Sequence, residues 1–146
     1  MSFNGDETEG EGMHALFEKA NRLSGEVLGA AIEVHRHKGP GLIESIYERC
    51  PGRELEIRQI SFVSQKCIPI EYKGFAFEES LRFDVLVEDC LLLELKAVEK
   101  ILPVHKAQLL SYMKLMNLRL GLLINFHEMR LVDGIYRMMI PEANRE

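Results

Sequence analysis

The 146-residue sequence lacks the features that mark exported and membrane-spanning proteins. Its three cysteines, Cys50, Cys67 and Cys90, form no Cys-x-x-Cys pair, and their odd number argues against a disulfide framework. A reducing cytoplasm is the simplest compartment for such a chain. No segment approaches the roughly 20 apolar residues of a membrane helix, and the polar, acidic start is unlike a secretory signal. These absences predict a soluble, cytoplasmic protein with no membrane partner.

The chain also has no surplus of basic residues. It carries 18 Lys and Arg against 23 Asp and Glu, a net charge of -5. Four of the acids lie in a Gly-rich leader, which leaves 19 acids against 18 bases in residues 13–146. Any affinity for nucleic acid must therefore come from a local patch and a bound metal, and it should be modest and salt-sensitive. No phosphate-cradling Gly loop, zinc site or nucleophilic triad is present in the sequence.

What the chain does have is enough apolar material for one core, since 47% of its residues are hydrophobic. Residues 1–12 are rich in Gly, Glu and Asp and predict a disordered acidic tail. Residues 13–146 show no internal repeat and no composition break, and we expect them to form a single domain.

Hydrophobic periodicity predicts two helices, several strands, a third helix and further strands. Residues 13–37 and 104–118 have apolar side chains at helical spacing. A second helix should begin near Leu42, and the Cys-Pro-Gly sequence at 50–52 should kink or stop it. The expected strands cover 62–70, 71–77, 82–87, 91–96, 120–126 and one or two segments of 130–140, with a turn or bulge at Lys73-Gly74. This order predicts a mixed α/β (α+β) fold with a central mixed sheet flanked by helices.

Charged residues interrupt the two central strands. Asp84 lies in the first, and Glu94 and Lys96 lie in the second, after a Glu-Asp-Cys turn. Strand side chains alternate faces, so Glu94 and Lys96 share one face, and Asp84 joins them if the turn forms a hairpin. Two carboxylates and an amine are costly on an apolar sheet. A divalent metal with a lysine beside a water would use them, but the spacing alone fits an internal ion pair equally well.

Two stretches of the sequence resemble a known family. Asp84 followed by Glu94-Leu95-Lys96 resembles the PD-(D/E)xK nuclease signature, without the proline. The segment GPGLIESIYE at 39–48 looks like the motif that names the GxxExxY protein family. Residues 94–99, 102–112 and 121–126 are also similar to that family. On these motifs the chain is identified as a member of the GxxExxY family within the PD-(D/E)xK superfamily, over roughly residues 20–138.

The resemblance implies a restriction-endonuclease-like core and a metal-dependent nuclease that hydrolyses phosphodiester bonds of DNA, with RNA as a less favoured substrate. Asp84 and Glu94 would bind Mg²⁺ or Mn²⁺ together with the backbone carbonyl of Leu95. Lys96 would orient or help to deprotonate the attacking water. Glu44 would reach in from the second helix as a further ligand or a water-positioning group.

Other predictions concern the third helix and the partners. Gln108 and Tyr112 share a helical face and resemble a Gln-x-x-x-Tyr element near the site of exonuclease-like relatives; a surface glutamine and a core-edge tyrosine is an equal alternative. His105 is expected to be a capping or otherwise satisfied histidine. The alternative function is a catalytically silent module for protein or nucleic-acid binding. A homodimer or a partner subunit could supply substrate recognition.

Overall fold

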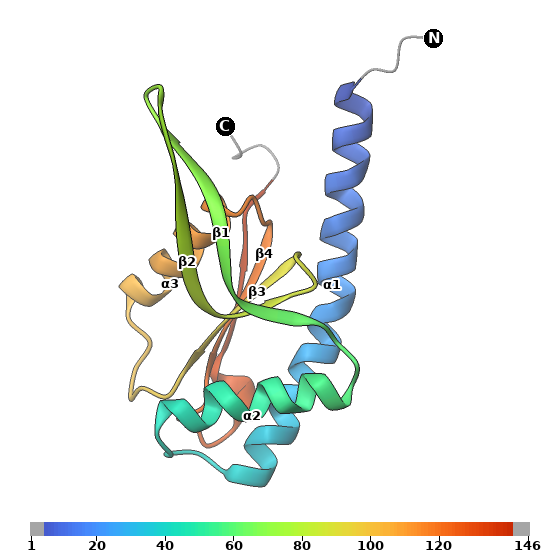
Figure 1. Cartoon of the computed structure of the whole chain (residues 1–146). Coiled ribbons are helices and arrows are strands. Elements are labelled where there is room, and N and C mark those ends of the chain that lie inside the picture. Colours follow the sequence, from blue (N-terminus) through green and yellow to red (C-terminus); the bar gives the residue numbers. More distant parts are fainter. Residues whose placement is uncertain (1–4, 142–146) are drawn as a thin grey trace.

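The computed structural model describes residues 5–141 and begins with the long helix α1 (Gly5–Lys38) (Figure 1). This helix starts eight residues earlier than the sequence predicts, so the expected disordered tail differs from the structure over residues 5–12. A composition rich in Glu and Asp is typical of disorder, but it also suits the first turns of a helix, where acidic groups face the positive end of the helix dipole. Residues 1–4 of the expected tail lie outside the described residues.

The sequence predicts that Pro51 kinks or stops the second helix, and helix α2 (Glu44–Ile57) continues through it, so the helix is not stopped at this point. A proline inside a helix removes one backbone hydrogen bond, and here packing offsets that loss. Pro51, Gly52 and Leu55 are all buried. A Cβ atom on Gly52 would lie 3.1 Å from the ring of Phe62, so the glycine lets the helix and the first strand approach closely.

The sheet has five strands in the order β1-β2-β3-β4-β5. Only the β3–β4 pair is parallel, and α3 (Pro103–Leu115) makes the crossover between these strands. The predicted mixed sheet flanked by helices is therefore confirmed. The strands are β1 (Phe62–Tyr72), β2 (Phe75–Val87), β3 (Leu91–Lys96), β4 (Leu120–Asn125) and β5 (Ile135–Met139), with a short 3-10 helix, η1 (Leu131–Gly134), before β5.

One boundary differs from the sequence-based prediction. The expected separate strand over 71–77 is divided by a two-residue turn, and its second part continues into the strand that carries Asp84. Lys73 and Gly74 both have positive φ angles, +48° and +84°. Two such residues form the tight turn whose twist matches a hairpin.

The sheet is covered on both faces (Figure 1). Helices α1 and α2 pack on one face and α3 packs on the other, and each face has its own core of buried aliphatic side chains. No helix within residues 5–141 is long and apolar enough to cross a membrane.

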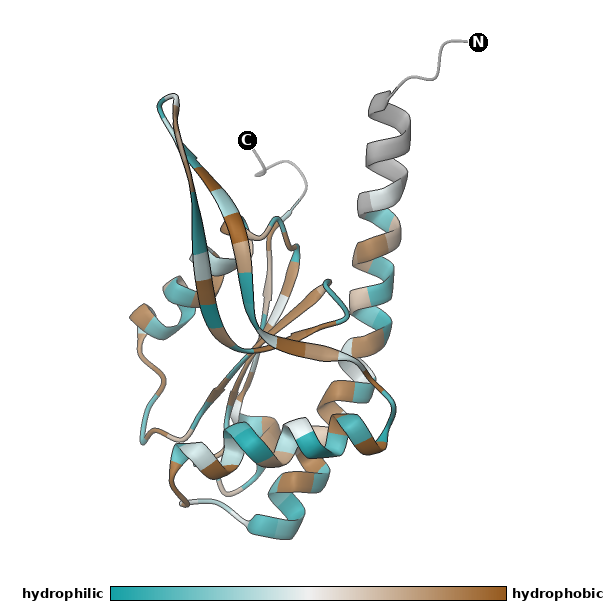
Figure 2. Cartoon of the chain, viewed as in Figure 1, coloured by the Kyte–Doolittle hydropathy of each residue, from teal (hydrophilic) through white to brown (hydrophobic). Residues whose placement is uncertain are grey.

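The β1–β2 hairpin extends beyond the rest of the sheet (Figure 1). Strand β2 pairs with β3 only through residues 85–87, whereas its pairing with β1 continues to the turn. We call residues 65–82, from the Gln65–Arg82 pair to the tip, the arm. Figure 2 shows hydrophobic and hydrophilic residues alternating along it.

Candidate active site

The β2–β3 hairpin brings Asp84 and Glu94 to one place, as its sequence predicts. The antiparallel register pairs Val85 with Leu93, and its continuation sets Asp84 opposite Glu94. Here the backbone ladder between the strands ends, and a carboxylate oxygen of Asp84 accepts a hydrogen bond from the Leu95 N–H at 2.7 Å. The β1–β2 register also shifts next to Asp84, between Val63 and Gln65. An irregularity of this kind can re-aim a side chain at a strand end.

Glu94 is the buried charge of the site. The residue is 8% exposed, and its Oε1 atom has no hydrogen-bond partner. Burial, followed by the nearby Asp84 carboxylate, raises the pKa of Glu94 to about 8, against a smaller lowering by Lys96. Two neighbouring carboxylates, one of them buried, are costly to ionise at the same time.

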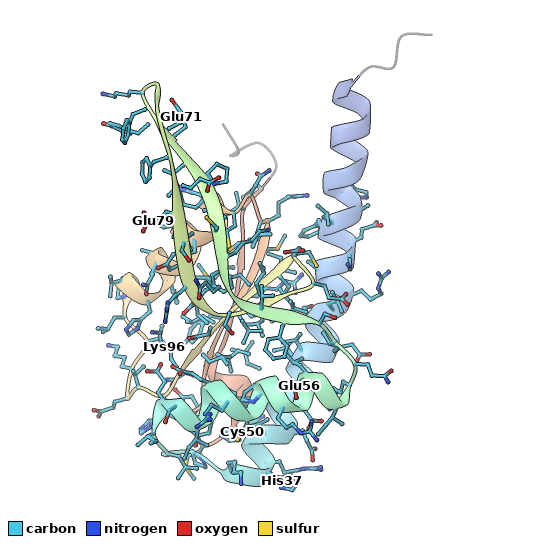
Figure 3. All side chains as sticks on the ribbon, in the orientation of Figure 1. His37, Cys50, Glu56, Glu71, Glu79 and Lys96 are labelled. Atoms are coloured by element: carbon cyan, nitrogen blue, oxygen red, sulfur yellow. The ribbon has the colours of Figure 1, made fainter. Side chains whose placement is uncertain are left out.

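Lys96 and helix α2 form the second side of the site. The Nζ atom of Lys96 lies 4.0 Å from a carboxylate oxygen of Glu44, the first residue of α2. One turn further on, Glu48 has its pKa raised by partial burial and then by the charges of Asp84 and Glu44. Sequence reasoning missed Glu48, although its spacing of four from Glu44 places both side chains on one helical face. Figure 3 shows Lys96 near the start of α2.

Tyr47 holds the start of α2 in place. Its ring is fully buried and stacks on Phe126, with centroids 4.6 Å apart and an angle of 9° between the planes. Its hydroxyl donates to the Gly39 carbonyl and accepts from the Leu42 N–H at 3.2 Å. The three residues that give the GxxExxY motif its name therefore have distinct positions: Gly41 lies in the loop with a φ angle of +87°, Glu44 faces Lys96, and Tyr47 anchors the turn.

Asn125 holds the backbone of the segment that follows Lys96. It is buried at the end of β4, and its side-chain amide donates to the Val98 carbonyl at 2.8 Å and accepts from the Val98 N–H at 3.1 Å. The Phe126 N–H also donates to the Lys96 carbonyl at 2.8 Å. Interactions of this kind restrict the backbone on which Lys96 is carried.

The two site residues predicted on α3, Gln108 and Tyr112, make no hydrogen bond or ion pair with the group formed by Asp84, Glu94 and Lys96 in the described part of the chain. Gln108 is exposed, and Tyr112 is half-buried against the core beneath α3. Their role near the site therefore stays a prediction. The capping role of His105 is confirmed, because the Leu102 N–H donates to its Nδ1 atom at 2.9 Å.

The donor set of the site fits a hard cation. Asp84 and Glu94 lie opposite each other in the hairpin, Glu44 contacts Lys96, and the free oxygen of Glu94 is an oxygen donor of the kind that Mg²⁺ and Mn²⁺ prefer. Within residues 5–141, however, no three carboxylate, imidazole or thiolate groups lie close enough to share one metal ion. The predicted set with Glu44 as a third carboxylate ligand is not assembled here, because Glu44 is turned toward Lys96.

The five-stranded mixed sheet flanked by helices is the fold of a class of nucleases. The chain matches the family model of the PD-(D/E)XK nuclease superfamily over residues 21–138, and it belongs to this superfamily. No curated protein and no solved structure matches it.

Proposed function

We propose that this protein is a metal-dependent nuclease of the GxxExxY group that hydrolyses phosphodiester bonds of DNA, with RNA a less favoured substrate. The observation that carries the proposal is the buried, unpartnered Oε1 atom of Glu94, which lies opposite Asp84 in the hairpin. An orphaned carboxylate oxygen costs free energy unless something binds it. Three unpaired cysteines support a cytoplasmic location.

Asp84, Glu94 and the Leu95 carbonyl would hold Mg²⁺ or Mn²⁺. The N–H and C=O groups of one strand residue point to the same edge, and the Leu95 N–H already bonds to Asp84. The Leu95 carbonyl therefore faces the same edge as this carboxylate. When bound, the cation would neutralise charge on the scissile phosphate and on the leaving oxygen.

Lys96 and the α2 carboxylates would position and activate the attacking water. Lys96 would orient the water with its ammonium group or, as a neutral amine, help to remove its proton. Glu44 would hold Lys96 in position through their close contact, or turn to position the water itself. Glu48 adds negative charge on the same side of the site. Gln108 and Tyr112 are proposed to lie along the substrate path, on the strength of their motif alone.

The test is direct. Purified protein is incubated with linear, circular and single-stranded DNA and with RNA, with Mg²⁺ or Mn²⁺ or with a chelator. We expect cleavage that requires the cation and that falls at least about 100-fold in Asp84→Ala and Lys96→Ala variants, a typical loss for a group acting on the reacting water. Glu71→Ala is the matched control, because Glu71 is an exposed carboxylate near the tip of the arm (Figure 3).

Two results would contradict the proposal. Unchanged cleavage in the Asp84→Ala and Lys96→Ala variants would show that the activity comes from elsewhere. No cleavage of any substrate, together with no cation binding by calorimetry, would favour the silent binding module.

A further inference from the structure

The arm has one apolar face and one polar face. Directly opposed residues of a hairpin lie on the same face, and the register opposes Tyr72 to Phe75, Ile70 to Phe77 and Ile68 to Glu79. The alternate residues, which include Glu71 and Glu78, lie on the other face. One side of the ribbon is therefore a row of aromatic and aliphatic side chains.

This apolar face is covered at its base and open toward its tip. Ile68 is only 5% exposed, whereas Phe77 is 38% exposed and Tyr72 and Phe75 are each 65% exposed. The ring centroids of Phe75 and Phe77 lie 5.3 Å apart, and the two rings form a small aromatic cluster. A two-stranded ribbon is marginally stable alone, and exposed apolar clusters of this kind mark interaction surfaces.

We propose that the apolar face of the arm binds the same face of a second copy of this chain, with the two arms antiparallel about a two-fold axis. A two-fold interface uses one patch twice, so the patch must be complementary to itself. If the axis passes beside position 76, Phe75 of each copy meets Phe77 of the other. The same arrangement sets Lys73 of each copy beside Glu79 of the other, because both pairs are centred on the same position.

The charges along the arm fit this register. The Nζ atom of Lys73 lies 5.4 Å from the centre of the Tyr72 ring, so the lysine lies over the apolar face at the tip. Glu79 lies on that face further down the arm (Figure 3). An antiparallel stack therefore brings opposite charges together at both ends of the aromatic cluster, which also selects this register over shifted ones.

The arm is a poor surface for nucleic acid. Exposed aromatic rings can stack on bases, but such sites combine them with a positively charged groove. Here three acids, Glu71, Glu78 and Glu79, balance the three bases of the arm, Lys66, Lys73 and Arg82, so the arm has no net positive charge. The lack of a net positive charge therefore favours a protein partner, and the self-complementary pattern makes a second copy of this chain the partner that fits.

The interface should be weak. Each aromatic side chain carries roughly 150–250 Å² of surface, and the arm offers three that are already partly covered. Two copies would then bury well under the roughly 1,200 Å² of a standard stable interface from these rings alone. We therefore expect a reversible dimer with a dissociation constant in the micromolar range.

Sedimentation velocity across a concentration series tests this inference on the full chain, and it does not depend on the proposed function. We expect Phe75→Ser to raise the dimer dissociation constant at least about 10-fold, as for a central aromatic anchor. Met129→Ser is the control, because Met129 is 82% exposed and lies outside the arm, and it should leave the constant unchanged. Lys73→Glu and Glu79→Lys should each weaken the dimer about 3- to 10-fold, and the double variant should restore it.

Three outcomes would overturn the inference. The first is a wild-type chain that stays monomeric up to about 1 mM, far above the micromolar dissociation constant expected here. The second is a dimer unaffected by Phe75→Ser and by the charge reversals, which would place the interface elsewhere. The third is a loss of DNA binding in Phe75→Ser with no change in association, which would assign the aromatic cluster to nucleic acid. If Phe75→Ser fails to fold, the charge-reversal pair still decides, because rescue in the double variant requires the contact between copies.

Discussion

The two halves of β2 differ in both burial and polarity. Residues 83–87 lie within the sheet, and Val85, Leu86 and Val87 are almost completely buried. Residues 75–82 belong to the arm and are mostly exposed. Yet the inner half carries Asp84, opposite the buried Glu94, and the outer half carries the exposed rings of Phe75 and Phe77. The inner half thus places carboxylates in an apolar sheet, and the outer half places aromatic rings in solvent; both placements cost free energy unless a partner covers them. We propose that a metal ion binds at the first place and a second copy of the chain at the other.

The largest expected difference lies between the core, represented by Phe126, and the arm, represented by Phe75, when each phenylalanine is changed to alanine. Phe126→Ala should destabilise the monomer by about 3–5 kcal/mol, because it leaves a cavity in the core against the Tyr47 ring. Phe75→Ala should change stability by no more than about 0.5 kcal/mol, since its ring is largely in solvent. Urea unfolding at low protein concentration measures both. Equal losses would show that the arm is an integral part of the core.

The second prediction concerns the buried charge. The folded-state pKa of Glu94, about 8, lies above the ordinary value of 4.5, so the folded protein binds more protons than the unfolded chain between these values. Without divalent cations, stability should therefore fall as pH rises from about 4.5 to about 8 and then level off, by a few kcal/mol at most.

Thermal unfolding across this pH range checks that prediction. Glu94→Gln should flatten the curve, whereas Glu71→Gln, at an exposed carboxylate of the arm, should not. Added Mg²⁺ at pH 8 should stabilise the wild type more than the Glu94→Gln variant. A wild-type curve that rises over this interval would contradict a raised pKa of the buried Glu94 carboxyl group.

A smaller effect is expected where the core meets the site. Tyr47→Phe keeps the ring that stacks on Phe126 but leaves the Gly39 carbonyl and the Leu42 N–H without their hydroxyl partner. We expect a loss of about 1–2 kcal/mol in unfolding free energy. Cleavage should also weaken, because the loop that leads to Glu44 is less restricted. A stable variant with full activity would show that the hydroxyl does not position Glu44.

The smallest effect is expected at the start of α3. His105→Ala removes the acceptor for the Leu102 N–H and should cost about 0.5–1 kcal/mol, similar to the loss of a helix cap. Gln108→Ala, on the same helix at an exposed position, is the matched control and should be nearly neutral. If both variants lose the same unfolding free energy in chemical denaturation, the result would contradict a stabilising capping role for His105.

The parts of the fold that sequence could predict are those governed by local pattern. The short apolar strands, the β2–β3 turn and the start of α3 near Pro103 follow from periodicity and turn chemistry, and the hairpin sets Asp84 and Glu94 opposite each other. The charge of this pair on an apolar background is the sequence feature that predicts a site here.

The predictions that failed concern features that depend on contacts between residues far apart in the sequence. Helix α2 continues through Pro51 because Gly52 allows Phe62, ten residues later, to pack against it. The electrostatic interaction of Glu48 with Asp84 and Lys96 arises only because α2 lies beside the end of β3. The orientation of Glu44 toward Lys96, rather than into a set of three carboxylates, likewise depends on how a helix docks on a sheet.

The continuity of β2 has a geometric consequence. One unbroken strand joins the tip of the arm to Asp84, and at about 3.3 Å per residue the nine steps from Phe75 to Asp84 span roughly 30 Å. In a pair of chains joined by antiparallel arms, the two sites would lie at opposite ends of the stack, about 50 Å apart at most. That span equals about 15 base pairs of duplex DNA. The arm would then serve as a ruler that fixes the distance between two cuts.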